Sequence, residues 1–307
     1  MKSFLQEVSL GLSKKNKKLS SKWFYDFHGS KLFEQITKLD EYYPARTERK
    51  ILKDNKIEIA NKIGKNAILI EPGAGDIKKI AIFLSSLDKP KKYIPLDISE
   101  NYITKISQGF KKKFPKVAIT PKGYDFSGNK KLPFKINLSE NIIIFFPGST
   151  IGNFEKKDAV KFLKMLKTKF KAKKIIIGAD LVKDIPTLIS AYDDKKGVTA
   201  KFNKNILQRI NTELGGDINL NSYKHLAIYN KSKKRIEMRL KSKKNNNIKI
   251  NGSKYLIKKN EEIHTENSHK YTIKSFKNIA NEAGWKIKKT WVDDKKLFSV
   301  HCLDPAL

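Results

Sequence analysis

Residues 141–146 read NIIIFF, an apolar run that ends at Pro147-Gly148. A strand that is apolar on both sides must be covered on both faces, as in a parallel sheet flanked by helices. Further strand patterns of this kind lie at 67–71, 92–97, 117–120 and 174–180, and helical patterns lie between them at 78–87, 99–114 and 156–170. Because strands and helices alternate, the sequence predicts an α/β fold with a parallel, doubly wound sheet.

The alternation of single strands and helices ends at Asp184. Two helical patterns lie at 185–192 and 198–214. Strand-like segments follow at 225–230, 235–242, 248–250, 255–258 and 262–269. A helix at 272–283 and strands at 285–291 and 297–303 finish the chain, and the last two are expected to form an antiparallel hairpin. We therefore expect a mostly helical segment at 1–63 with a loop at 39–47, a parallel-sheet domain at 64–183 and 270–307, and an inserted β-rich lobe at 184–269.

Charge and cysteine content narrow the class of protein. The formal net charge is +34, which would suggest a nucleic acid or an anionic membrane as partner. Only five of the 65 cationic residues are arginine, however, and the lysines are spread along the whole chain without interleaved aromatics. No apolar run is long enough to cross a bilayer, the N-terminus lacks the apolar core of a signal peptide, and Cys302 has no cysteine partner. We expect a cytoplasmic protein that binds neither nucleic acid nor membrane.

The turn after the first parallel strand is rich in glycine. Gly73 and Gly75 would let the backbone approach a ligand closely, at the sheet edge where parallel folds bind ligands. The full dinucleotide fingerprint is absent, because its third glycine would fall at Lys78. This disfavours a nicotinamide dehydrogenase, although a glycine turn after a strand can also be only a turn.

Acidic residues follow the next two strands. Asp97 could accept both hydroxyls of a ribose, and Asp125 could accept the adenine amino group while the Phe126 ring supports the base. Carboxylates at these positions disfavour a phosphate-bearing cofactor and favour adenosine carried by a cationic group. An Asp that ends a strand can also be a helix cap. Together the positions predict S-adenosylmethionine as the cofactor.

Several ordered segments, from about residue 21 to the C-terminus, resemble one family. These segments are 22–26 (KWFYD), 29–34, 41–48 (EYYPARTE), 148–154 (GSTIGNF), 180–184, 191–203, 236–238 and 265–270 (TENSHK). The chain resembles the histidine-specific S-adenosylmethionine-dependent methyltransferases, which trimethylate the α-amine of L-histidine to give hercynine for ergothioneine synthesis. The resemblance implies a Rossmann-like class I methyltransferase sheet, a substrate-recognition lobe at 184–269, and a contribution of 1–63 to the active site.

The resemblance also implies roles for individual residues. The residues that match cofactor-binding positions are Tyr25, Phe33, Gly73, Lys79, Asp97, Asp125 and Phe126. Those that match substrate-binding positions are Tyr42, Gly148, Asn153, Tyr192, Thr199, Met238, Glu266 and Ser268, with Tyr42 also assigned to catalysis. Within the second set, Asn153 and Tyr192 would hold the carboxylate and amine of the amino acid, Glu266 and Ser268 would recognise the imidazole, and Gly148 and Thr199 would act through water.

The residues themselves leave alternatives open. Glu266 could accept a proton from an imidazole N–H, which would make histidine selective, but Glu266 and Ser268 could also be one exposed face of a strand. Tyr25, Phe33 and Tyr42 could be core aromatics. None of the five histidines has metal-ligand spacing, so we predict no metal and no catalytic histidine.

The predicted reaction is an in-line attack of the neutral α-amine on a sulfonium methyl group. We expect a monomer whose partners are L-histidine and its mono- and dimethylated forms. Methylation of another amino acid or of an indolic amine is the first alternative. A basic nucleic-acid binder or methyltransferase is the second, but a base-flipping enzyme would need Asn-Pro-Pro-Tyr where this chain has Phe146-Pro-Gly-Ser149.

Overall fold

A computed structural model describes residues 3–75, 78–126 and 131–306. The chain divides into two compact units, each built from two segments. Unit 1 comprises Met1–Tyr42 and Lys183–Ser268, and unit 2 comprises Tyr43–Val182 and His269–Leu307. Because the segments alternate along the sequence, the chain passes from one unit to the other three times.

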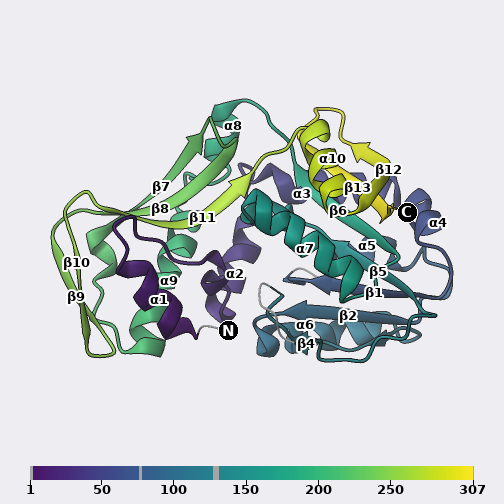
Figure 1. Cartoon of the computed structure of the whole chain (residues 1–307), viewed down its shortest axis with the longest axis horizontal. Helices are drawn as coiled ribbons and strands as arrows, with labels where there is room; N and C mark the ends of the chain where they lie inside the picture. Colours follow the sequence, from purple (N-terminus) through teal and green to yellow (C-terminus); the bar gives the residue numbers. More distant parts are fainter. Residues whose placement is uncertain (1–2, 76–77, 127–130, 307) are drawn as a thin grey trace. The chain divides into compact units, whose positions relative to one another are not determined.

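Unit 2 contains a large sheet with helices (Figure 1). Its strands are β1 (Ala67–Pro72), β2 (Lys92–Asp97), β3 (Ala118–Ile119), β4 (Lys122–Gly123), β5 (Asn141–Phe146), β6 (Lys174–Asp180), β12 (Trp285–Val292) and β13 (Phe298–Pro305). Its helices are α3 (Tyr43–Asp54), α4 (Lys56–Ile63), α5 (Lys78–Leu84), α6 (Glu100–Lys113), the 3₁₀ helix η2 (Thr150–Asn153), α7 (Lys156–Thr168) and α10 (Ile273–Glu282). The sheet order is β12-β13-β6-β5-β1-β2-β3, with β4 also paired to β2.

The pairing confirms a mostly parallel, doubly wound sheet. Strand β1 pairs in parallel with both β2 and β5, and β5 pairs in parallel with β6. The direction of strand addition therefore reverses between β1 and β5, which makes the carboxyl ends of these two strands the switch point where such sheets bind ligands. The predicted hairpin is also confirmed, since β12 and β13 are antiparallel and β13 joins the sheet against β6.

Both faces of this sheet are buried, which explains the uninterrupted apolar run of β5. Ile142, Ile144 and Phe146 pack on the face that α7 and α10 cover. Ile143 and Phe145 pack on the opposite face, with buried residues of α3, α4, α5 and α6. Successive strand residues point to opposite faces, so both sets had to be apolar.

Unit 1 combines helices with two small antiparallel sheets (Figure 1). Its helices are α1 (Phe4–Leu12), η1 (Ser21–Phe24), α2 (Phe27–Ile36), α8 (Ile185–Ser190), α9 (Val198–Leu214) and η3 (Leu220–Ser222). Its strands are β7 (Tyr223–Asn230), β8 (Arg235–Ser242), β9 (Asn246–Ile250), β10 (Ser253–Ile257) and β11 (Glu262–His269). The sheets are ordered β11-β8-β7 and β10-β9, so the expected β-rich character after Asp184 is confirmed.

One local expectation is wrong, and one short strand was not expected. Residues 43–47 belong to helix α3 and not to a loop, because Pro44 lies in the first helical turn, where proline is tolerated. The two-residue strand β4 was not expected, since so short a bridge leaves no periodic pattern. Among the described helices, none has the length and apolar character needed to span a membrane.

Candidate active site

The turn after β1 places Gly73 against the ring of Phe126. Gly73 has a φ of +72°, and its N–H donates to the Leu96 carbonyl over 2.7 Å. A Cβ at this position would lie 3.4 Å from the Phe126 ring, in a backbone conformation that side chains rarely adopt. Two residues predicted to bind the cofactor are therefore neighbours, and a side chain on Gly73 would contact the ring.

Asp97 is a buried carboxyl at the end of β2. It accepts a hydrogen bond from the Ser99 N–H at 2.8 Å, and its own carbonyl accepts one from the Tyr124 N–H at 2.8 Å. Burial raises the pKa of Asp97 to about 6, although hydrogen bonds from backbone N–H groups oppose this. The Tyr124 bond also holds the half-buried Asp125 and Phe126 close to the strand end.

These features fit the adenosine part of S-adenosylmethionine. A buried carboxyl with a raised pKa is stabilised as an anion by hydroxyl donors, which a ribose supplies. The aromatic ring of Phe126, next to Gly73 with its bare backbone, suits a flat base. Asp97, Gly73 and Phe126 are thus the residues of unit 2 best suited to hold this group.

Lys79 takes part in a buried ion pair. Its ammonium lies 2.7 Å from Glu48 Oε2, and the two side chains are 9% and 1% exposed. The Gly148 N–H donates to both Glu48 oxygens at 2.9 Å. Gly148 has a φ of +81°, and a Cβ there would lie 3.4 Å from the Lys79 ammonium. The structure thus brings Lys79 and Gly148 together around Glu48, for which no role was predicted from the sequence.

A second buried cluster fixes the loop after β5. Lys270 pairs with Asp180 at 2.7 Å, and the Tyr43 hydroxyl donates to the same carboxylate. The Asp180 N–H in turn donates to the Ser149 hydroxyl at 2.9 Å. This loop leads into η2, which ends at the half-buried Asn153. Within the described residues the Asn153 amide has no hydrogen-bond partner, so it is available to a ligand.

The predicted aromatic residues of unit 1 form one cluster. Phe33 lies 5.6 Å from Tyr25 and 6.1 Å from Tyr42, between ring centroids, and Tyr42 lies 6.1 Å from Tyr192. Phe202 of α9 completes the cluster at 5.4 Å from Tyr25 and 5.8 Å from Phe33. Tyr42, Tyr192 and Phe202 are buried, whereas Tyr25 and Phe33 are only partly buried, and the ring contacts fix the positions of the tyrosine hydroxyls. Phe202 was missed by sequence reasoning because no ligand role distinguishes it from other apolar residues.

The cluster continues into strand β11. The hydroxyls of Tyr192 and Ser268 lie 2.7 Å apart, in a hydrogen bond. Glu266 is 9% exposed and Ser268 is 4% exposed, so the alternative that they form an exposed face is wrong. The Thr265 hydroxyl, one residue before Glu266, lies 3.0 Å from the carbonyl oxygen of the buried Met238. Tyr192, Glu266 and Ser268 are thus buried, as is Met238 on the neighbouring strand β8, although Thr265 lies on the face of β11 opposite Glu266 and Ser268.

Thr199 stands at the start of α9. Its backbone N–H donates to Asp194 Oδ1 at 2.7 Å, which fixes the first helical turn. Burial opposes ionisation of Asp194, but hydrogen bonds from the N–H and the side chain of Thr199 both help to lower the pKa of Asp194. The structure thus ties Thr199 to the loop before α9.

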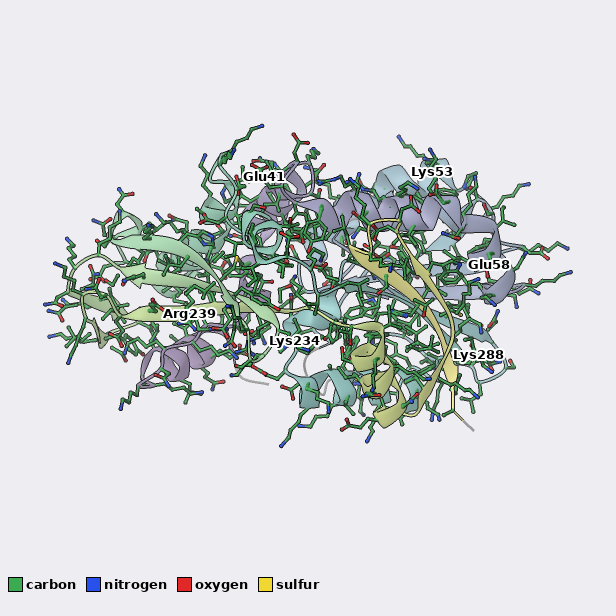
Figure 2. The ribbon with its side chains drawn as sticks, turned by 90° about the horizontal axis from the view of Figure 1, so that it is seen from above. Glu41, Lys53, Glu58, Lys234, Arg239 and Lys288 are labelled. Carbon is green, nitrogen blue, oxygen red and sulfur yellow. The ribbon has the colours of Figure 1, made fainter. Side chains whose placement is uncertain are left out.

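Strand β8 also carries charges, on the face opposite Met238. Arg239 lies on this strand (Figure 2), and it pairs with Glu237 and, at 2.6 Å, with Glu262. Burial opposes ionisation of Glu237, but hydrogen bonds from Arg239 and Arg235 outweigh it and lower the pKa of Glu237 to about 2. The opposite charges pair with one another, although the buried Arg239 Nε has no hydrogen-bond partner among the described residues. In the described part of the chain, no group of His, Cys, Asp and Glu side chains is arranged to hold a metal ion.

The candidate residues are divided between the two units. Unit 2 carries seven of them, namely Gly73, Lys79, Asp97, Asp125, Phe126, Gly148 and Asn153. Unit 1 carries Tyr25, Phe33, Tyr42, Tyr192, Thr199, Met238, Glu266 and Ser268. The residues assigned to adenosine thus all lie in unit 2, and those assigned to the imidazole all lie in unit 1.

Comparison with known proteins extends this description. The profile of the family described as histidine-specific methyltransferase, S-adenosylmethionine-dependent, matches residues 4–305. The chain belongs to this family. It is 33% identical over 295 residues to a histidine N-alpha-methyltransferase of Mycolicibacterium smegmatis, which covers 94% of this chain and 90% of that protein. It is 26% identical to the L-tryptophan methyltransferase trpM of Psilocybe serbica, over 90% of this chain and 85% of that protein.

As a member of the histidine-specific methyltransferase family, the chain is an S-adenosylmethionine-dependent enzyme. Its sheet is the Rossmann-like sheet of class I methyltransferases, with the mostly parallel strands and antiparallel end described above. A solved S-adenosylmethionine-dependent methyltransferase from Clostridium acetobutylicum is similar to it with a TM-score of 0.49 and 12% identity, covering 90% of this chain and 98% of that one.

Proposed function

We propose that this enzyme methylates the α-amine of L-histidine, and that it does so three times to give hercynine, the precursor of ergothioneine. The observation that carries the proposal is the buried arrangement on β11, where Ser268 is bonded to Tyr192 and Glu266 lies two residues away on the same face. A buried carboxylate and a hydroxyl suit the two nitrogens of an imidazole. The histidine N-alpha-methyltransferase of Mycolicibacterium smegmatis supports the choice of amino acid.

In the proposed reaction, S-adenosylmethionine supplies a methyl group that its positive sulfur already activates. The chain then has to hold a neutral amine at the correct distance and angle. Tyr192 and Asn153 would orient the substrate through its carboxylate and amine, and Tyr42 would hydrogen-bond near the reacting nitrogen. Glu266 would keep the imidazole in place while the amine rotates between successive transfers.

Glu266 provides the sharpest test. Replacing it with alanine removes the acceptor for an imidazole N–H, so we expect the Kd of histidine to rise by about a hundredfold. Calorimetry with histidine, in the presence of S-adenosylhomocysteine, measures this change. The matched control is Glu262→Ala on the same strand, because Glu262 pairs with Arg239 and has no proposed role in binding. Equal affinity for histidine in the wild type and Glu266→Ala would refute the imidazole anchor.

The number of transfers is tested separately. Mass spectrometry of histidine incubated with the enzyme and S-adenosylmethionine should show products with one, two and three added methyl groups, the last one accumulating. A product that stops at one or two methyl groups would restrict the proposal to partial methylation.

A second substrate class is an indolic amino acid. It is favoured by one observation, the 26% identity to a protein named as an L-tryptophan methyltransferase. A panel of free amino acids in the same methyl-transfer assay separates the two. Because Glu266 is buried and an indole carries one N–H rather than two ring nitrogens, we expect histidine to exceed tryptophan in kcat/KM.

We further propose that the enzyme acts as a cytoplasmic monomer. Its single cysteine, Cys302, is buried, and burial raises the pKa of its thiol to about 11, which makes the thiol unreactive. Light scattering coupled to size-exclusion chromatography should give the mass of one chain.

A further inference from the structure

A buried chain of hydrogen bonds connects three polar side chains in unit 1 to which no role has been assigned. His225 of β7 is 5% exposed, Asn203 of α9 is fully buried, and Thr265 of β11 is 1% exposed. The three come from different elements of the sequence, and each is bonded to the next. Such a chain fixes the spacing of the helix and the sheet between which it runs.

The positions of the protons follow from the partners. Asn203 Nδ2 lies 3.1 Å from the Arg239 carbonyl oxygen, which can only accept, and 2.7 Å from His225 Nδ1. Since the amide nitrogen donates in both directions, His225 Nδ1 must accept and carries no proton. His225 Nε2 lies 2.7 Å from the Tyr192 carbonyl oxygen, again only an acceptor, so Nε2 carries the proton. The geometry therefore requires a neutral His225 in one tautomer.

The other end of the chain reaches strands β8 and β11. The Thr265 hydroxyl lies 2.7 Å from Asn203 Oδ1 and 3.0 Å from the Met238 carbonyl oxygen, and its single proton is shared between these two acceptors. The chain thus ends on the backbone of Tyr192, on the backbone of Met238, and one residue before Glu266. All three have proposed contacts with the acceptor amino acid.

We propose that His225, Asn203 and Thr265 are positioning residues that set the pocket for the acceptor amino acid, with His225 fixing the position of Tyr192. The inference rests on the proposed function of Tyr192, Met238 and Glu266. The three positioning residues act through these groups and touch neither the substrate nor the methyl donor.

Charged groups around His225 affect the pKa of its imidazole. Asp193 Oδ1 lies 3.9 Å from Nε2, Asp194 is close in the same loop, and Lys204 of α9 opposes both. Burial lowers the pKa of His225 below its usual 6.5, and this outweighs the two acidic residues. Protonation at low pH would place an Nδ1–H against the Asn203 amide, so affinity for the amino acid should fall only in acid.

The test separates binding of the two substrates. His225→Phe preserves the ring but leaves the Tyr192 carbonyl and one Asn203 N–H unpaired, so the Kd of histidine should rise by about tenfold or more. The Kd of S-adenosylhomocysteine, whose adenosine part is assigned to residues of unit 2, should stay within about twofold. His225→Gln retains a donor for the Tyr192 carbonyl and should recover most of the lost affinity.

The matched control is Tyr223→Phe, two residues earlier on the same strand and equally buried, because its hydroxyl has no partner among the described residues. It should leave both Kd values unchanged. Thr265→Val, which removes only the hydroxyl, should repeat the result of His225→Phe and replaces it if that variant does not fold.

Three outcomes decide the proposal. Histidine affinity that is unchanged in His225→Phe and Thr265→Val, with normal binding by the wild type, would overturn it. If His225→Phe weakens the binding of both ligands equally, or if Tyr223→Phe has the same effect as His225→Phe, the three hydrogen-bonded residues have only a structural role. Either result would also overturn the proposal. A wild-type enzyme that fails to bind histidine would instead contradict the proposed function.

Discussion

Among single residues, Asp97 shows how burial prepares a side chain for a ligand. The carboxyl is 8% exposed and its pKa is about 6, well above that of an exposed aspartate. In the free enzyme it therefore gains a proton when the pH falls below 6. A ribose that donates two hydrogen bonds needs the ionised form, so binding of the cofactor and of this proton should compete.

This competition gives a pH dependence with a defined sign. We expect the Kd of S-adenosylhomocysteine to rise by about tenfold between pH 7 and pH 5, because the ligand must displace a proton below pH 6. Calorimetry at several pH values measures the change. Asp97→Asn should bind weakly at pH 7 and show no such dependence; a wild-type Kd that stays constant over this range would remove Asp97 from the ribose site.

Functional residues could be predicted from the sequence only where they follow strands that the sequence pattern itself indicates. Asp97, Gly73 and Phe126 were found because they follow consecutive strands of one sheet. His225 and Asn203 were not, because a lone buried histidine in a sequence looks like any other. Their partners come from the loop after α8, from α9 and from β11, and only the folded chain brings these segments together.

At the scale of elements, helix α2 depends on a glycine. Asp26 caps this helix by accepting the Gly29 N–H at 2.7 Å, and Asn205 of α9 donates to both Asp26 and the Phe24 carbonyl. A Cβ on Gly29 would lie 1.8 Å from the Phe24 carbonyl oxygen and 2.8 Å from Asn205 Nδ2. The helix can therefore pack here only without a side chain.

Gly29→Ala should accordingly destabilise the fold by about 2 kcal/mol, the usual cost of a forced backbone shift. The change also displaces the segment that holds Tyr25 and should lower methyl-transfer activity. Thermal unfolding measures the effect. Gly109→Ala is the control, since a Cβ on Gly109 in helix α6 meets nothing within 4 Å; it should stabilise by about 0.5–1 kcal/mol. Similar midpoints for the two variants would contradict the packing argument.

Elements were predicted well where one physical signal dominates. The run at 141–146 indicated a strand covered on both faces, and α3, α4, α5 and α6 on one side with α7 and α10 on the other confirm it. The same reasoning failed at Pro44, because proline is compatible with both a loop and a first helical turn. The packing of α3 against β13 favours the helix over the loop, and this contact cannot be predicted from the local sequence.

At the scale of the whole molecule, charge is the dominant feature. The formal net charge is +34, and Lys53, Lys234 and Lys288 are exposed examples labelled in Figure 2. The buried pairs Lys79–Glu48 and Lys270–Asp180 are shielded from solvent ions, whereas the surface lysines repel one another through water.

Screening should therefore stabilise this protein. We expect the midpoint of thermal unfolding to rise when sodium chloride is increased from about 10 mM to about 200 mM, since the Debye length falls below the spacing of many surface lysines. An equal osmolarity of sucrose is the control for effects other than screening. A midpoint that falls with salt would show that attractive surface pairs outweigh the repulsion.

Strand β13 lies inside the sheet, between β6 and β12, although it is formed by residues 298–305. During synthesis on the ribosome, β1, β2, β5 and β6 emerge long before the strand that covers β6. The edge of the apolar strand β6 stays unpaired until the whole of Lys183–Ser268 has been translated and β13 has followed it. The nascent chain is thus exposed to aggregation during this interval, and chaperone demand should depend on the translation speed of the intervening segment.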